Sequence, residues 1–277
     1  YTKDMNGAQV QNWGLTTPSG TLAGVDNRPY YTDADKINNA YVFTNSDKGR
    51  IWNASFKAQK TFDNGLYTML AYSYLDSKDV NSIEAEITGD AFDFNPVVGD
   101  VNSDELSYSR YGDTHRIIGV VSKKWNYGAN KKWGTTLSTF FEYARGGRFS
   151  YTYAGNINGD TSGQNNDLIY VPTSAEIQLM QFDPTGSPQQ AVAFDNYIAQ
   201  DDYLSGRRGQ YAERYGAQTP WRSRWDVKFL QDYKIKISEN KTNTIQFSID
   251  VLNFGNLIRS EWGLVQQPNN TSPVGVS

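Results

Sequence analysis

Short and long connections alternate along this chain between segments that have the pattern of β-strands. Three connections are short, polar and typical of turns: 60–66, 126–134 and 237–242. Three others are long: 14–48, 77–113 and 154–220. A β-sandwich has no reason to keep all its long loops at one end, whereas a transmembrane β-barrel has tight turns at one rim and long loops at the other. In the first short connection, Asn64-Gly65 suits the positive φ angles of a hairpin turn.

The segments between these connections alternate apolar and polar residues with a period of two, as strands do when their faces meet different surroundings. The alternation is clear in 52–59, 224–235 and 245–251 and weaker in 136–143. Strands are also expected near 66–76 and 115–124, where the pattern leaves the facing open. Leu230 and Gln231 are the misfits in 224–235. The sequence therefore predicts an all-β, antiparallel fold.

Aromatic residues are frequent for so polar a chain. Trp (7), Tyr (19) and Phe (13) make up 14% of the 277 residues, while all hydrophobic residues reach 38%. A soluble core of this size would usually carry more Leu, Ile and Val. The rings also cluster near predicted strand ends: Trp125, Tyr127 and Trp133 surround one turn, and Trp221 and Trp225 open another strand. Such clusters resemble the aromatic girdles of membrane barrels, and strands of about 10 residues are long enough to cross a bilayer.

Several function classes are excluded or disfavoured. The chain has no Cys and one His, which excludes thiol chemistry and Cys-bearing zinc sites, and its net charge of −4 argues against a nucleic-acid partner. No stretch approaches the roughly 20 apolar residues of a membrane helix. His115 stands at a strand end without a G-x-S-x-G nucleophile motif, so we expect it to be hydrogen-bonded at the rim. Nothing in their spacing singles out an acid pair among the 30 carboxylates. We expect no enzymatic activity.

One loop has oxygen-bearing residues at calcium-loop spacing. Asn156, Asn158, Asp160 and Asp167 occupy positions 1, 3, 5 and 12 of such a loop. Thr161 stands at position 6, where glycine is usual, Asp167 replaces the bidentate Glu, and no flanking helix pair is evident. Calcium is therefore one reading of this loop. The other is a polar extracellular hairpin that uses Asn and Gly for turn geometry.

The longest connection holds a second candidate site. Segment 188–206 is expected to contain a short helix, and a stretch dense in Arg and Tyr follows it. Its candidate ligand-contacting residues are Arg207, Arg208, Tyr211 and Arg214. Arg and Tyr are favoured at binding surfaces, which supports an outer loop that contacts a ligand. The alternative is packing of loop against loop through Arg–Glu pairs and stacked rings.

Several segments together resemble the outer-membrane TonB-dependent transporters of the Oar-like group, which are related in style to the SusC nutrient importers of Bacteroidetes. The matching stretches are Asp63-Asn64-Gly65-Leu66-Tyr67, Ala71-Tyr72-Ser73-Tyr74, His115-Arg116, Asn158-Gly159-Asp160, Asn166-Asp167-Leu168-Ile169-Tyr170-Val171-Pro172, Arg208-Gly209-Gln210-Tyr211-Ala212-Glu213-Arg214, Thr219-Pro220-Trp221 and Asp250-Val251-Leu252-Asn253-Phe254-Gly255-Asn256. The resemblance implies that 1–277 is the C-terminal part of one barrel of about 22 strands. The plug, the final strands and the residues that couple to TonB would lie outside this chain.

We therefore expect a partial set of strands from a transmembrane barrel with long extracellular loops. About seven strands are evident, so the remaining strands must come from the rest of the protein, because an open edge in lipid leaves backbone groups unpaired. Five residues are expected to face the lumen: Asp226, Lys228, Asp232, Lys234 and Asp250. Six are expected to face lipid: Trp225, Val227, Phe229, Ile245, Phe247 and Ile249.

The function expected from these features is import of a bulky substrate across the bacterial outer membrane, driven by the TonB complex. Two alternatives stay open. One is a barrel of the same group that serves as a scaffold or adhesin and binds surface lipoproteins. The other is a soluble carbohydrate-binding β-domain. The substrate class stays open as well, because loop chemistry on a shared barrel decides it.

Overall fold

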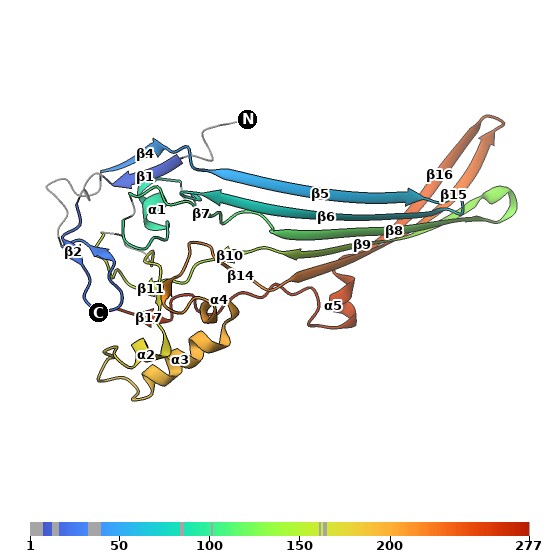
Figure 1. Ribbon diagram of the computed structural model, residues 1–277. Helices are drawn as coiled ribbons and strands as arrows, with labels where there is room; N and C mark the ends of the chain where they lie inside the picture. The colour runs from blue at the N-terminus through green and yellow to red at the C-terminus, as the bar shows by residue number, and fades with distance from the viewer. Residues whose placement is uncertain are drawn as a thin grey trace.

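Six long strands form one antiparallel sheet (Figure 1) in the order β16-β15-β9-β8-β6-β5. The computed structural model describes residues 8–12, 17–32, 40–83, 86–100, 102–160, 162 and 165–276. The long strands are β5 (Arg50–Thr61), β6 (Leu66–Asp79), β8 (His115–Tyr127), β9 (Trp133–Arg145), β15 (Arg222–Ser238) and β16 (Lys241–Val251). Short β7 (Ser107–Tyr108) pairs with the end of β6. The six segments expected to be strands all lie within these elements, which confirms the all-β, antiparallel class.

The connections at the two ends of the sheet differ as predicted. Residues 62–65, 128–132 and 239–240 join the strands into hairpins at one end, and the second turn contains a 3-10 helix, η1 (Ala129–Lys131). The long connections 80–114 and 146–221 both lie at the other end, together with the short strands β1 (Ala8–Asn12) and β17 (Val274–Gly275) (Figure 1). The segregation of tight turns from long loops is therefore confirmed.

Successive hairpins are staggered in one direction. The first residue of β6, Leu66, pairs with Lys123, and β8 runs four residues further, to Tyr127. In the same way β15 runs five residues past Tyr233, the partner of Trp133 at the start of β9. Figure 1 shows the β15–β16 hairpin extending furthest beyond its neighbours. A stagger that keeps one direction is how a sheet with tilted strands closes into a barrel.

The long connections fold into a loop layer, by which we mean the described residues of 17–32, 80–114, 146–221 and 252–276. Its helices are α1 (Thr88–Asp93), α2 (Ser174–Ile177), α3 (Gln190–Gln200), α4 (Asp202–Ser205) and α5 (Phe254–Ile258). The helix expected within 188–206 is thus present as α3 and α4. Among the residues that the structure describes, none of the helices has the length and apolar character needed to span a membrane.

Short strand pairs complete this end of the molecule. They are β1 (Ala8–Asn12) with β4 (Tyr41–Asn45), β2 (Gly20–Thr21) with β3 (Pro29–Tyr30), β10 (Arg148–Phe149) with β14 (Ala217–Gln218), β12 (Tyr170–Val171) with β13 (Gln210–Tyr211), and the parallel pair of β11 (Tyr153–Ala154) with β17 (Val274–Gly275). Local capping sets where the helices begin. Thr173 and Glu176 form a capping box at α2, and the Asp201 carboxylate accepts the first free N–H groups of α4.

The hydrophobic core lies in the loop layer. Its buried side chains are Tyr151, Tyr153, Leu168, Ile169, Val171, Ile177, Phe194, Ile198, Leu204, Ala212 and Ala217. A smaller cluster contains Tyr31, Ala91, Phe92 and Val97. In the six long strands, by contrast, only Gly134, Ala144 and Asp232 are buried. No second layer therefore covers either face of the sheet within the described part of the chain.

The turn between β5 and β6 supplies a first prediction. Gly65 has φ +84°, and a Cβ there would lie 2.5 Å from the carbonyl oxygen of Lys124 on the neighbouring hairpin. Replacement of Gly65 by Ala should therefore lower the free energy of unfolding by about 2–3 kcal/mol, measured by denaturant titration of the full-length protein. Gly24→Ala is the control, because Gly24 has φ +100° but no atom within 4 Å of its Cβ position. Equal losses in the two variants would contradict a role for the contact between hairpins.

Candidate functional site

The hydrogen-bond register sorts the side chains of the sheet onto two faces, because directly paired residues point to the same side. We call one face the apolar face. It carries Trp52, Ala54, Phe56, Ala58, Leu70, Tyr72, Tyr74, Ile117, Gly119, Val121, Leu137, Thr139, Phe141, Tyr143, Trp225, Val227, Phe229, Ile245, Phe247 and Ile249. The six residues expected to face lipid all lie here. The register thus joins strands from both halves of the chain into one apolar surface.

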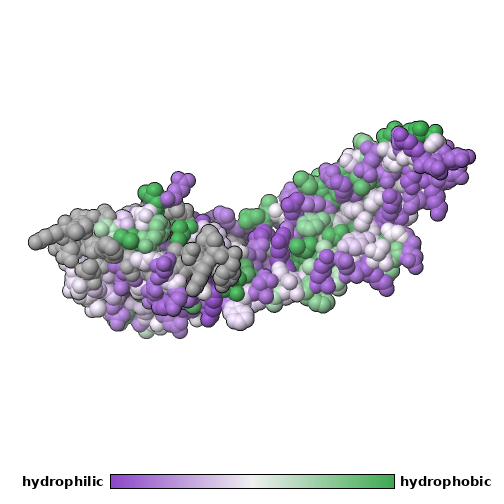
Figure 2. All heavy atoms as spheres, turned by 90° about the horizontal axis from the view of Figure 1, so that it is seen from above, coloured by the Kyte–Doolittle hydropathy of each residue, from purple (hydrophilic) through white to green (hydrophobic). Residues whose placement is uncertain are grey.

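This apolar face is exposed. Phe56 is 68% exposed, Phe247 58% and Leu70 56%, on three different strands. Figure 2 shows hydrophobic side chains at the surface along the sheet. The pocket formed by Phe141, Trp225 and Trp262 marks the place where the chain after β16 folds over one corner of the face. An uncovered apolar surface of this extent marks a contact with a membrane or with another protein.

Two aromatic belts border the apolar face. At the turn end lie Trp125, Tyr127, Trp133 and Tyr233, with the Trp133 and Tyr233 ring centroids 4.5 Å apart. At the loop end lie Tyr72, Tyr74, His115, Tyr143, Trp221 and Trp225. Along β8 the ten residue steps from His115 to Trp125 span about 33 Å, or about 25 Å for strands tilted by about 40°. That height matches the apolar band of an outer-membrane barrel.

Two polar side chains lie in these aromatic belts, and each forms a hydrogen bond with a neighbouring side chain. His115 Nδ1 is hydrogen-bonded to the Tyr72 hydroxyl at 2.9 Å, which confirms a hydrogen-bonded histidine at the start of a strand. Gln231, a misfit in the strand pattern, lies in the turn-end belt, where its Oε1 accepts a hydrogen bond from Thr135 Oγ1 at 2.8 Å. Polar groups at this level of a membrane barrel lie in the interfacial zone, where water remains within reach.

We call the opposite side of the sheet the polar face. The five residues expected to face a lumen share it: Asp226, Lys228, Asp232, Lys234 and Asp250. Ion pairs cross it between Arg116 and Glu142 (2.6 Å), Lys124 and Asp232 (3.3 Å), and Lys228 and Asp250 (3.1 Å). Leu230, the other misfit of the strand pattern, also lies on this face, opposite Ser248. The polar face suits contact with water, whereas the apolar face does not.

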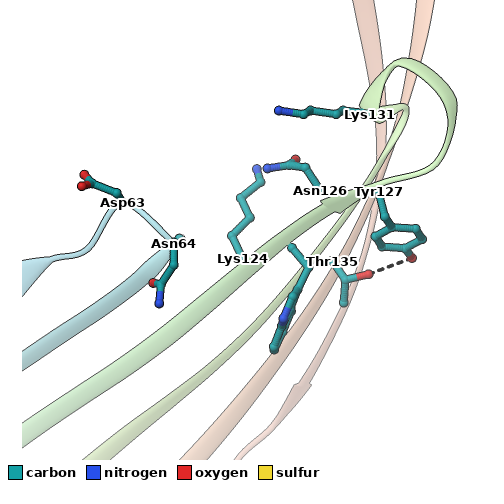
Figure 3. A pocket seen from close by; sticks show the side chains of 9 residues that line it. Asp63, Asn64, Lys124, Asn126, Tyr127, Lys131 and Thr135 are labelled. Atoms are coloured by element: carbon teal, nitrogen blue, oxygen red, sulfur yellow. Dashed lines mark hydrogen bonds between the residues drawn. The ribbon is translucent and has the colours of Figure 1, made fainter.

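A hollow at the turn end marks the step between two staggered hairpins. Figure 3 shows the β5–β6 turn with Asp63 and Asn64 on one side of this hollow and the end of β8 on the other, with the Asp63 carboxylate pointing away from β8. Lys124 and Asn126 point to one side of β8, while Tyr127 points to the other and is hydrogen-bonded to Thr135 at 3.0 Å. Because the lining side chains belong to both faces, the hollow is the edge of a step in the sheet and not an enclosed ligand site.

A buried arginine holds the loop layer together. The Arg28 side chain has no exposed surface, and its Nε lies 3.0 Å from Asp26 Oδ1 while its Nη1 lies 3.1 Å from Asp167 Oδ1. The guanidinium also lies over the rings of Tyr153 and Tyr211, at 5.1 and 5.4 Å from their centroids. Both tyrosine hydroxyls donate to Asp26. The cluster thereby joins segment 17–32 to two distant parts of the chain.

The residues of the suggested calcium loop lie in one loop, and three of them, Asn158, Asp160 and Asp167, are fully buried. The first side-chain oxygens of Asn156, Asn158 and Asp160 each accept a backbone N–H two or three residues further on. Asp167 differs, because its carboxylate is held by the buried arginine described above. Thr161 lies outside the described residues. Within those residues, no three Asp, Glu, His or Cys side chains gather closely enough to hold a metal ion.

The Arg and Tyr residues suggested as ligand contacts are engaged within the loop layer. Arg207 pairs with Glu213 at 3.2 Å, and Arg208 pairs with Asp195 at 2.7 Å. Tyr211 belongs to the buried arginine cluster described above. These contacts are the loop-to-loop packing that the sequence offered as the alternative; ligand contact by the same residues stays a prediction.

Arg214 is the most buried of this group, at 3% exposure. It donates to the carbonyl oxygens of Asp79 and Val80, to Asn95 Oδ1 at 3.1 Å and to the Glu105 carbonyl at 3.2 Å. Burial lowers the pKa of its guanidinium, and the negative charge of Asp79 opposes that effect. Arg214 therefore binds the longest connection to the connection between β6 and β8.

Sequence reasoning did not identify Arg28 or Asn166. Arg28 stands in an ordinary loop stretch, and apart from Asp26 its hydrogen-bond acceptors, Asp167 and the Leu168 carbonyl, lie 139 and 140 residues away. Asn166 directly precedes Asp167 and is 1% exposed; its side-chain amide donates to Asp160 Oδ2 at 3.2 Å. The one sequence feature that could have pointed to Asn166 is its position next to Asp167, a suggested calcium ligand.

Replacement of Arg214 tests how the loop layer is held. Arg214→Met should lower the stability of the layer by about 3–5 kcal/mol, because four acceptors would lose their donor and the partly buried Asp79 carboxylate, 3.6 Å away, would lose its counter-charge. Arg208→Met, which removes a partly exposed ion pair, should cost at most about 1 kcal/mol. Protection of loop-layer amides from hydrogen exchange measures both. Similar losses would contradict the anchoring role of Arg214.

Asp167 predicts a pH dependence. Burial, together with the negative charge of Asp160, raises the pKa of the Asp167 carboxyl to about 6, and the Arg28 guanidinium opposes the shift. Because the pKa is higher in the folded than in the unfolded chain, this group's contribution to stability is full below about pH 4 and is lost as the pH rises through about 6. The change should be about 3 kcal/mol.

The difference between wild type and Asp167→Asn isolates this contribution. Hydrogen exchange of residues 155–168, corrected for the intrinsic rate at each pH, should show a decline in wild type between pH 4 and 7 that the variant lacks. The same decline in both proteins would assign the titration to another group.

The chain was compared with known proteins in three ways. Protein-family models, curated proteins and solved structures each gave no match. A functional assignment therefore depends on the two-faced sheet and on the loop layer that it carries.

Proposed function

We propose that this chain forms part of the wall and the outer loops of a β-barrel in a bacterial outer membrane, and that the complete barrel is a TonB-dependent importer of a bulky substrate. The main observation that supports a membrane barrel is the exposed apolar face between two aromatic belts. A soluble β-domain would bury such a face against a second layer, whereas lipid covers it in a membrane barrel. The same observation disfavours a soluble carbohydrate-binding domain.

The two edges of the sheet support an assembly with further strands. Among the described residues, β5 pairs only with β6, and β16 pairs only with β15. The free edge of each strand is long and carries unpaired backbone groups, which cost several kcal/mol each in lipid. Strands supplied by the rest of the native protein would pair with both edges and close the barrel.

Two observations support transport: the chemistry of the polar face and the resemblance of the sequence to TonB-dependent transporters. The polar face presents paired charges to the enclosed side, as expected of a wet or plugged lumen. The motifs that resemble those of TonB-dependent transporters lie in the β5–β6 turn and β6, at the start of β8, in the loop layer and at the end of β16. Energy coupling would be carried by parts of the protein outside this chain.

One observation favours a second candidate, a barrel that serves as a scaffold or adhesin. The loop layer has its own hydrophobic core and two buried arginines, so it is a folded unit at one end of the sheet. A folded outer surface can dock a surface lipoprotein without moving any substrate.

An uptake experiment separates the importer from the scaffold. It measures uptake of labelled peptides, oligosaccharides and metal chelates by intact cells, with and without TonB. Uptake that needs both this protein and TonB supports the importer; lipoprotein binding without any uptake supports the scaffold.

Site-directed spin labelling tests the orientation of the sheet directly. The chain has no Cys, so a single Cys introduced into it is labelled alone. In the native protein in membranes, labels at positions 245, 247 and 249 should be accessible to oxygen, and labels at 246, 248 and 250 to a water-soluble nickel complex. Equal access of both reagents along the strand would contradict a lipid-facing side.

Arginine substitution gives a paired test on one strand. Phe247→Arg places a charge on the apolar face at mid-strand and should impair assembly by about 2–4 kcal/mol, measured as folded yield in the outer membrane. Gln246→Arg is the matched control, because Gln246 lies on the polar face and is already hydrogen-bonded to Asp232. Asp250→Asn should also leave the barrel intact. Equal yields of Phe247→Arg and wild type would overturn the assignment of the faces.

A further inference from the structure

Asp160 is a fully buried carboxylate without a cationic partner among the described residues. Its Oδ1 accepts the Ser162 N–H at 3.0 Å, and its Oδ2 accepts the Asn166 amide at 3.2 Å. The buried arginine nearby does not neutralise it, since Arg28 pairs with Asp26 and Asp167. A buried charge without a counter-charge is costly, so the loop has a place for a cation.

Asparagine side chains surround this carboxylate. Burial raises the pKa of the Asp160 carboxyl. Hydrogen bonding from the side chains of Asn166, Asn158 and Asn156 lowers it and so opposes that shift. The amide oxygens of Asn156 and Asn158 each accept one backbone N–H and keep a second lone pair for a metal ion. A half-turn of the Asn166 amide would exchange its NH2 group for its oxygen on the side of Asp160. Carboxylate and amide oxygens together are the ligands that calcium prefers.

Asn166 provides an independent sign of a missing ligand. It is 1% exposed, and its Oδ1 is buried without a hydrogen-bond partner among the described residues, while the NH2 group of the same amide donates to Asp160. A buried acceptor without a donor costs about 1–3 kcal/mol. A cation bound at Asp160 would satisfy this oxygen and the uncompensated carboxylate together.

The local charge balance also favours a divalent cation. Beyond the effect of burial, the negative charges of Asp100 and Asp160 raise the pKa of Tyr31, and the charge of Asp160 raises the pKa of Asp167. The one positive charge nearby, on Arg28, is shared between Asp26 and Asp167. Four carboxylates and one guanidinium leave three negative charges, of which one calcium ion would neutralise two.

We propose that Asp160 and Asn166, with the amide oxygens of Asn156 and Asn158, bind a calcium ion that locks the loop layer. The ligand set differs from the one that the sequence spacing suggests, because Asp167 stays with Arg28 and Asn166 takes its place. Tyr31 N–H donates to the Asn158 carbonyl at 2.7 Å, so the ion would also fix segment 17–32 to this loop. The site does not depend on whether the sheet lies in a membrane.

The experiment uses the full-length native protein, freed of metal with a chelator and then titrated with calcium. Hydrogen exchange of residues 155–168 is followed, and terbium emission excited through nearby tyrosines reports binding. We expect protection of these amides to rise about tenfold when calcium reaches ten times its Kd. Calcium, but not an equal concentration of magnesium, should displace terbium.

Asp160→Asn is the test variant, and its behaviour without metal separates binding from misfolding. In chelator it should be at least as well protected as wild type, because it removes an uncompensated buried charge. With calcium it should show no gain and no terbium emission. Asp202→Asn, an exposed carboxylate in the same loop layer, is the matched control and should respond as wild type does. Three outcomes would contradict the proposed calcium site. They are an equal calcium response in Asp160→Asn and wild type, an equal response to magnesium, and no response in wild type.

Discussion

The hydrogen-bond register of the long sheet is the constraint on which the other features depend. Because side chains alternate with a period of two, a slip of one residue between two strands would exchange their faces. The observed pairing keeps Phe229 beside Ile249 and Lys228 beside Asp250. Repeated across six strands, it yields one apolar and one polar surface from segments that are up to 200 residues apart. Apart from the corner where the chain after β16 folds over the apolar face, no described residue covers either surface.

The loop layer is stabilised by different means. It is built on a conventional hydrophobic core and on two buried arginines, each of which joins segments distant in sequence. Arg28 fixes segment 17–32, and Arg214 fixes the connection between β6 and β8. Arginine suits this task, because a planar guanidinium has five N–H donors and can satisfy several carbonyl and carboxylate groups at once. The layer is therefore a folded surface held at the end of the sheet.

Much of the sheet could be predicted from local sequence pattern. The strands, the turns and the side on which residues such as Asp226 and Phe247 lie follow from alternation and from turn chemistry, which are short-range properties. The contacts within the loop were predicted less completely. The spacing places Asn156, Asn158 and Asp160 in one loop, but the structure pairs Asp167 with Arg28 and puts the Asn166 amide beside Asp160. The partners of these residues come from other loops, and spacing along one loop carries no information about them.

The sequence by itself determined the period-two strands, the tight turns and the segregation of long connections to one end, because each depends on neighbours within a few residues. Only the tertiary structure decided that the apolar stripes join into one exposed band and that the long connections share a core. It also decided that the buried Asp160 carboxylate has no counter-charge among the residues that the structure describes. These properties depend on which distant segments meet, and the energy of burying or pairing a charge is set by that meeting.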